Sequence, residues 1–200
     1  MQDTPNELSS PLQYAVRVQS AAVLIALIAA GSYIAIPLPG SPVPVVLQNM
    51  FVILTGMVLP PLLATGTVGV WLLLGVAGLP VFAGGSGGFG HLLGPTGGFL
   101  TAYLVAPAVT SLLLRTLPGR GKRPFLLSQR PRLVLIPAIV AGFGVVYLGG
   151  IPWLRHILQV SWPQAFAAGM VPFLVGDLLK ILVLVSLVGS IPESVWRNWS

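Results

Sequence analysis

The chain has no cysteine, and only four of its 200 residues are aspartate or glutamate. The lack of cysteine excludes a disulfide framework, a thiolate metal site and a cysteine nucleophile. Charged residues of both signs make up 7% of the chain, compared with about a quarter in an ordinary soluble domain. Because 55% of the residues are hydrophobic and the apolar runs are long, the composition indicates a polytopic membrane protein.

Several chemistries need residues that this sequence does not have. A phosphate loop needs Gly-Lys followed by Ser or Thr, but the Gly-Lys pair at 121–122 precedes arginine. GSGGFG at 85–90 resembles a dinucleotide fingerprint, but no acidic residue lies between Glu7 and Asp177 to bind a ribose. His91 has no carboxylate or cysteine near it in the sequence to complete a metal site. We therefore expect no enzyme activity, no cofactor and no metal.

Six apolar segments are expected to cross the bilayer, which makes the fold class an all-α membrane protein with six transmembrane helices. These segments lie at about 14–36, 46–63, 65–79, 96–115, 133–149 and 171–190. Residues 1–13 are predicted to form a polar cytoplasmic tail, residues 14–190 the six-helix transmembrane domain, and residues 191–200 a short C-terminal tail.

The basic residues predict the orientation of these helices. Six of the ten lie in one loop between spans four and five: Arg115, Arg120, Lys122, Arg123, Arg130 and Arg132. Because basic loops stay on the cytoplasmic side, both termini are expected in the cytoplasm of a multi-pass protein of the cytoplasmic membrane. The net charge of +6 is then a mark of topology and not of nucleic acid binding. The loops at 37–45, 80–95 and 150–170, which are rich in proline and glycine, are expected outside, where they cap a ligand pocket.

Asp177 and Lys180 are the charged pair within a predicted span. They are three residues apart and so lie on one face of a helix. Charged groups inside a membrane are usually functional, although a structural ion pair that satisfies itself is the alternative interpretation. Gln48 and Asn49 open span two, with Thr55 further in, and each can be interpreted as a polar residue of the helix end. Gln48 lies beside an outer loop and is also a candidate for the pocket.

Small side chains form a stripe along span one. Ala22, Ala26 and Ala30 recur every four residues and would let another helix approach closely. The stripe is either a docking surface for a partner membrane protein or a site of packing within the chain.

Three stretches resemble the BioY family, the biotin-specific substrate-capture (S) components of energy-coupling factor (ECF) transporters. They are PVPVVLQNMFVILTGMVLPP at 42–61, GLPVFAGGSGGFGHLLGPTGGFL at 78–100 and PFLVGDLLK at 172–180. The resemblance implies six helices, an outward-facing biotin pocket, and energising by a separate transmembrane coupling protein with two ATPase subunits. It also implies that the alanine stripe docks on that coupling protein.

If biotin is the ligand, its chemistry suggests roles for the candidate residues. Asp177 is expected to accept the ureido N–H groups of biotin, and Lys180 to bind its carboxylate, with Arg155 at the mouth as the runner-up. The glycine-rich loop is expected to wrap over the ligand, Phe82 and Phe89 to form an apolar wall, and Trp153 to shield the entrance. The loop contributes Gly84, Gly85 and Ser86 to the predicted site, and the start of the following span contributes Gly97 and Gly98. The alternative functions are an S component for another vitamin and a membrane-embedded enzyme that uses Asp177 and Lys180.

Overall fold

A computed structural model of the chain describes residues 9–116 and 135–188. Most of the predicted basic loop and the whole predicted C-terminal tail therefore lie outside the described residues. Of the predicted N-terminal tail, only residues 9–13 are described. The helices are α1 (Ser9–Tyr33), α2 (Gln48–Val58), α3 (Pro61–Val76), α4 (Gly90–Leu93), α5 (Gly97–Ala102), α6 (Ala106–Thr116), α7 (Ile136–Leu158), α8 (Trp162–Gly169), the 3₁₀ turn η3 (Val171–Phe173) and α9 (Leu174–Val188). Two short antiparallel strands, β1 (Ala35–Ile36) and β2 (Val45–Val46), form a hairpin between α1 and α2.

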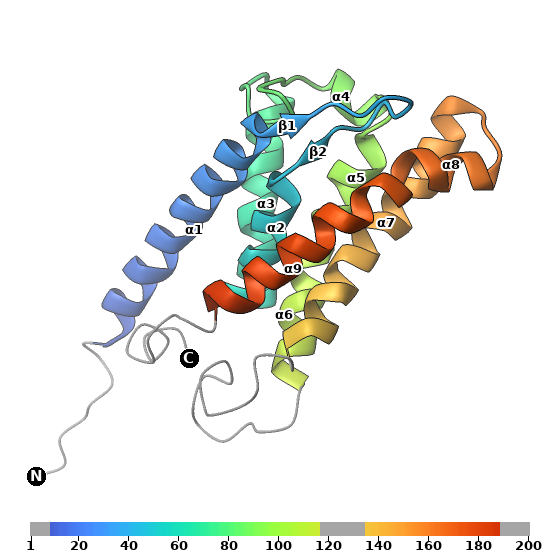
Figure 1. The fold of residues 1–200 in the computed structure, drawn as a ribbon. Coiled ribbons are helices and arrows are strands. Elements are labelled where there is room, and N and C mark those ends of the chain that lie inside the picture. The colour runs from blue at the N-terminus through green and yellow to red at the C-terminus, as the bar shows by residue number, and fades with distance from the viewer. Residues whose placement is uncertain (1–8, 117–134, 189–200) are drawn as a thin grey trace, which may run out of the picture.

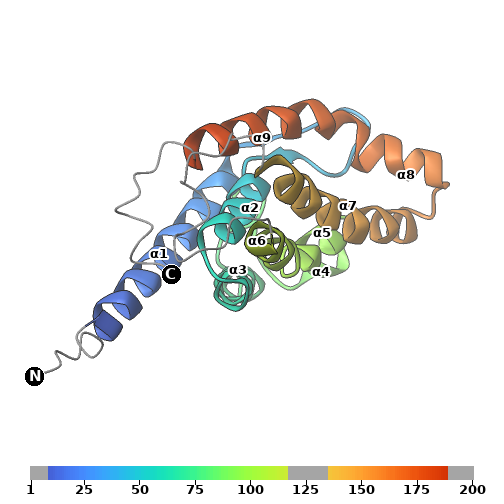
Figure 2. The ribbon, with the colours of Figure 1, turned by 90° about the horizontal axis from the view of Figure 1, so that it is seen from below.

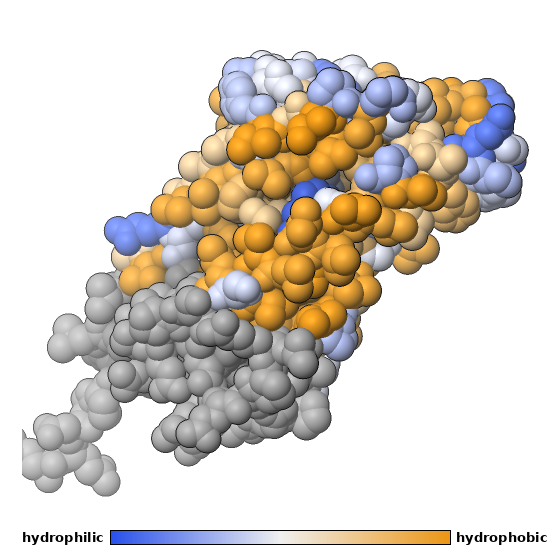
Figure 3. All heavy atoms as spheres, in the orientation of Figure 1, coloured by the Kyte–Doolittle hydropathy of each residue, from blue (hydrophilic) through white to orange (hydrophobic). Residues whose placement is uncertain are grey.

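Four stretches of the described chain are long and apolar enough to cross a membrane. They are Tyr14–Tyr33, Gly97–Thr116, Ile136–Leu158 and Trp162–Val188, and two shorter apolar helices, α2 and α3, accompany them. Hydrophobic residues cover most of the helical surface visible in Figure 3, whereas the end with the hairpin and the glycine-rich loop is more polar. This distribution is that of a membrane protein with a polar end.

The fourth predicted span, 96–115, is interrupted in the middle. Helix α5 ends at Ala102 and α6 begins at Ala106, with turns between them. Pro107 explains the interruption, because proline cannot donate a hydrogen bond to the carbonyl four residues earlier and its ring clashes with that carbonyl. The hydroxyl of Thr65 in α3 donates a hydrogen bond of 3.1 Å to the Leu104 carbonyl at the break, so a neighbouring helix supplies a partner there.

The prediction that residues 150–170 form a loop is wrong for its first half. Helix α7 continues to Leu158 with Pro152 inside it, and the short helix α8 occupies most of the second half. The glycines at 149–150, where the fifth predicted span ends, lie inside α7 and allow close packing. A Cβ on Gly150 would lie 2.2 Å from the ring of Phe99 in α5, so the two helices approach in a way that a larger residue would prevent.

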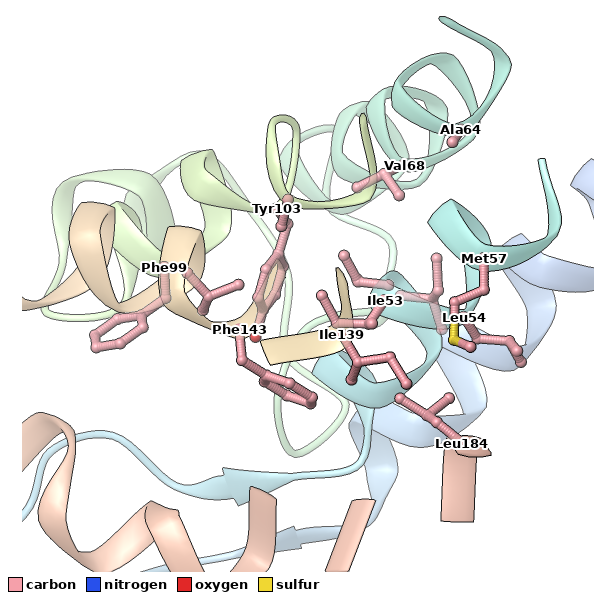
Figure 4. Close-up of a cluster of buried hydrophobic side chains, with 14 of the residues drawn as sticks. Ile53, Leu54, Met57, Ala64, Val68, Phe99, Tyr103, Ile139, Phe143 and Leu184 are labelled. Carbon is pink, nitrogen blue, oxygen red and sulfur yellow. The ribbon is translucent and has the colours of Figure 1, made fainter. Parts of the chain in front are cut away.

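The helices pack as a bundle that α9 closes on one side. Helix α1 packs on α2 and α3, α5 and α6 pack on α7, and α9 crosses α2 and α7 (Figures 1 and 2). The hairpin, α4 and α8 lie at one end, while the C-terminus of α6 and the N-terminus of α7 lie at the other (Figure 1). Apolar side chains from five of these helices meet in the core shown in Figure 4, among them Ile53, Val68, Tyr103, Ile139 and Leu184.

Candidate functional site

A cavity of about 470 Å³ lies at the end of the bundle that carries the hairpin. Its wall comes from the hairpin, the start of α2, the glycine-rich loop, α5, α7 and the segment from the end of α8 to the first turn of α9. Cavities of this size hold small molecules. Figure 3 shows a small hydrophilic area between the hairpin and α9, surrounded by hydrophobic residues.

The polar floor of the cavity is a network around Asp177. The Lys180 Nζ donates to Asp177 Oδ1 at 2.9 Å and to Asn49 Oδ1 at 2.9 Å. The Asn49 Nδ2 donates to the same Asp177 Oδ1 at 3.3 Å, and the Tyr147 hydroxyl donates to Asp177 Oδ2. Helices α2, α7 and α9 each contribute to this network, so the floor forms only when the three are packed together.

Asp177 retains room for one more hydrogen bond. A carboxylate offers about four acceptor positions, and Lys180, Asn49 and Tyr147 occupy three of them. Asp177 lines the cavity although only 4% of its surface is exposed. The position left at this carboxylate is thus available to a donor in the cavity.

Lys180 lies behind Asp177 and is not among the residues that line the cavity. It is 4% exposed, and two of its three donors are used by Asp177 and Asn49. The amine neutralises the carboxylate and fixes its orientation. This arrangement satisfies both charges, which a buried pair requires.

Aromatic rings form the apolar walls. Phe82, Phe99, Tyr103, Phe143 and Phe173 line the cavity from four different segments of the chain. Figure 4 shows Phe99, Tyr103 and Phe143 next to one another. Phe82 is 1% exposed and packs edge-on against the Trp71 ring at 5.3 Å between centroids. Such rings suit a ligand with an apolar ring system.

The glycine-rich loop (residues 80–95) holds Phe82 in place through its backbone. The Phe82 N–H donates to the Ser86 carbonyl at 2.8 Å, and between them Gly84 and Gly85 adopt positive φ angles of 71° and 72°. Side chains rarely tolerate this conformation. Phe82 and Ser86, together with His91 further along, line the cavity, so the loop forms part of its wall.

Four of the residues predicted for the site line the cavity together: Gln48, Phe82, Ser86 and Asp177. The others lie around it. Gly97 and Gly98 pack closely on Trp153, whose Nε1 donates to the Gly94 carbonyl at 2.9 Å. Two more are at the surface: Phe89 is 58% exposed, and the Arg155 guanidinium lies 4.8 Å from the centre of the Trp162 ring.

The Gly84 N–H donates to the Ser32 carbonyl at the end of α1, at 2.8 Å, so this residue anchors the loop. A Cβ on Gly85 would lie 2.8 Å from the Tyr33 ring.

Sequence reasoning missed several cavity residues, above all Asn49 and Tyr147. Asn49 was interpreted as a polar residue of the helix end, yet it bridges Asp177 and Lys180. Tyr147 carried a detectable signal, because a hydroxyl in the middle of an apolar span needs a partner. His91, Phe143 and Phe173 carried none. Among the residues that the structure describes, no group of three His, Asp or Glu side chains is placed to hold a metal ion.

Comparison with known proteins supplies independent findings. A model of the BioY family matches residues 5–197. The chain is 39% identical over 163 residues to a probable biotin transporter BioY of Pyrococcus horikoshii, covering 82% of this chain and 88% of that relative. It is 37% identical to the biotin transporter BioY of Thermotoga maritima, with the same coverage of each chain. A crystal structure of the S-component for biotin from an ECF-type ABC transporter matches with a TM-score of 0.81 and 26% identity, covering 98% of this chain and 100% of that one.

The network predicts a non-additive effect on stability. Lys180→Met leaves the buried carboxylate without its counter-charge, and Asp177→Asn leaves the buried amine without one, so each should lower the free energy of unfolding by about 3 kcal/mol. The double variant strands no charge and should lose much less than the sum of the two. Unfolding of the purified variants in detergent measures this, with Arg155→Met as a surface control expected to change stability by less than about 1 kcal/mol. Additive losses would contradict the coupling.

Proposed function

The chain belongs to the BioY family, and we propose that it captures biotin in the cavity and takes it up as the substrate-binding component of an ECF transporter in the cell membrane. The observation that carries this proposal is the floor of the cavity. A buried carboxylate, Asp177, faces an aromatic-lined space of about 470 Å³ with one acceptor position left. Biotin combines a cyclic urea, which has N–H donors, with an apolar ring and a carboxylate tail.

The arrangement of the cavity supports one orientation of the ligand. The ureido ring lies against Asp177, where its N–H group finds the acceptor, and the apolar ring lies among the aromatic walls. The carboxylate tail then points to the glycine-rich loop, where His91 is the cavity-lining side chain that can carry a positive charge. Lys180 supports the floor from behind, whereas Trp153, Arg155 and Phe89 act at the mouth. The glycines of the predicted site shape the wall: Gly84, Gly85, Gly97 and Gly98.

Biotin binding tests the function directly. The purified chain should bind labelled biotin at equilibrium and should not bind thiamine or riboflavin. Asp177→Asn should lower the affinity for biotin by roughly ten- to a hundredfold, because a hydrogen bond to a charged group contributes about 1.5–3 kcal/mol. Ser111→Ala is the matched control, since Ser111 is equally buried but bonds Leu59 outside the cavity. Preference for another vitamin would identify an S component of different specificity.

The partner surface proposed for the coupling protein lies on α1. Ala22, Ala26 and Ala30 are all exposed on this helix, whereas Leu24 and Ile28 face the core. Figure 2 shows α1 at the edge of the bundle, with its N-terminal part extending away from the other helices. We propose that a transmembrane coupling protein packs closely against the alanines and that two ATPase subunits supply the energy through it.

Enlarging one alanine should separate binding from transport. Ala26→Leu should leave biotin binding by the isolated chain unchanged, because the residue faces away from the cavity. Uptake by cells that also express the coupling protein and the ATPases should fall strongly, since a bulky side chain prevents close helix approach. Val140→Leu enlarges an exposed residue on α7 and should leave uptake intact. An equal fall in binding and uptake for Ala26→Leu would assign the stripe to internal packing.

We propose that the end with the hairpin and the glycine-rich loop faces outward and that both termini are cytoplasmic. The concentration of basic residues between Arg115 and Arg132 supports this orientation. The cavity lies at the same end of the bundle as the hairpin, which fits capture from outside the cell.

Two introduced cysteines test this orientation against a background without native cysteine. Ala77 and Thr116 are both exposed, the first beside the glycine-rich loop and the second at the end of α6. An impermeant thiol reagent should label Ala77→Cys in intact cells and Thr116→Cys only after the cells are opened. The reverse pattern would place the cavity on the cytoplasmic side.

A further inference from the structure

Gln48 carries an unexplained polar atom in the cavity wall. It is the first residue of α2, is 2% exposed and lines the cavity. Its Oε1 is buried without a hydrogen-bond partner. Buried acceptors in native proteins are nearly always bonded, because leaving one unpaired destabilises the fold.

The neighbouring network does not provide a partner. Asn49 is the next residue, and both ends of its side-chain amide are occupied by Asp177 and Lys180. The Tyr147 hydroxyl donates to Asp177. The other atom of this kind in the described part of the chain is Arg17 Nε, which belongs to α1 and does not line the cavity. The orphaned acceptor therefore belongs to a side chain of the cavity wall and has no partner in the adjacent network.

We propose that Gln48 is a second ligand contact, whose Oε1 accepts a hydrogen bond from the ureido ring of biotin. This inference rests on the proposed function, because it assigns a donor of the proposed ligand to an acceptor of the protein. A cyclic urea has two N–H donors, and the floor offers two acceptors: the position left on Asp177 and the Gln48 Oε1. Recognition of two donors at once selects a ring with N–H groups on both sides of its carbonyl.

The assignment has a signature that a structural role does not share. If Gln48 served the fold, replacing it would lower stability. If the Gln48 Oε1 is bonded only by the ligand, Gln48→Met removes an unpaired buried atom from the free protein and keeps the size of the side chain. The free protein should then be as stable as wild type or more stable, while its affinity for biotin falls.

Gln48→Met is compared with Thr55→Val, a matched control in the same helix. Thr55 is fully buried, its hydroxyl donates to the Phe51 carbonyl, and it does not line the cavity. Gln48→Met should weaken biotin binding by about fivefold, the size expected for one neutral hydrogen bond, with no fall in melting temperature. Thr55→Val should leave the affinity unchanged.

Two biotin analogues, each methylated on one ureido nitrogen, complete the test. Wild type should bind both more weakly than biotin. Gln48→Met should lose discrimination against the one analogue whose methylated nitrogen faces position 48 and keep it against the other.

Every outcome of these experiments either supports or overturns the assignment of Gln48. Unchanged biotin affinity in Gln48→Met, equal discrimination against both analogues, or a variant that is less stable or does not fold would overturn the assignment of Gln48. If the wild-type chain itself does not bind biotin, the proposed function fails and this inference fails with it. Wild-type binding together with an unaffected variant overturns the inference alone.

Discussion

The ion pair between Asp177 and Lys180 is the interaction on which the site depends. Two charges buried in an apolar bundle are tolerated only when each is paired and hydrogen-bonded. Asn49 from α2 and Tyr147 from α7 complete these bonds. Satisfying one pair therefore fixes the first turn of α9 against two helices that are distant in the sequence, and this junction is the floor of the cavity.

Close packing contacts determine the positions of the aromatic side chains that form the cavity walls. Gly150 allows the Phe99 ring to lie against α7, and Trp71 supports Phe82 from behind. The hairpin, which covers the cavity, is bonded to the helices: the Ser41 hydroxyl in the hairpin donates to the Ala168 carbonyl at the end of α8, at 2.7 Å. The hairpin, which lines the cavity, is in this way tied to the segment that leads into α9. Polar floor, aromatic wall and cover form one connected unit.

The sequence predicted the charged centre because a carboxylate is conspicuous in an apolar run. In the structure this last span begins with a 3₁₀ turn that contains Pro172, before α9 starts at Leu174. The partners could not be predicted from one sequence. Asn49 meets Asp177 and Lys180 across 128 and 131 residues, and no local pattern encodes such a contact. For the same reason, the spacing placed Lys180 beside Asp177 but could not show that its amine turns away from the cavity. The packing role of Gly150 in α7 likewise involves Phe99, a residue of another helix.

Neutralisation of the carboxylate explains how the floor can favour an uncharged ring. Without Lys180, the Asp177 carboxylate would attract any cation small enough to enter. With the amine bonded to it at 2.9 Å, the floor presents acceptor atoms but no net charge, and a cation gains little there for the loss of its hydration. A neutral ring with N–H donors gains hydrogen bonds instead, because acceptors that have no partner in the empty cavity are satisfied. In the proposed binding mode, selectivity for a cyclic urea over a cationic vitamin such as thiamine follows from the neutral floor together with its free acceptors.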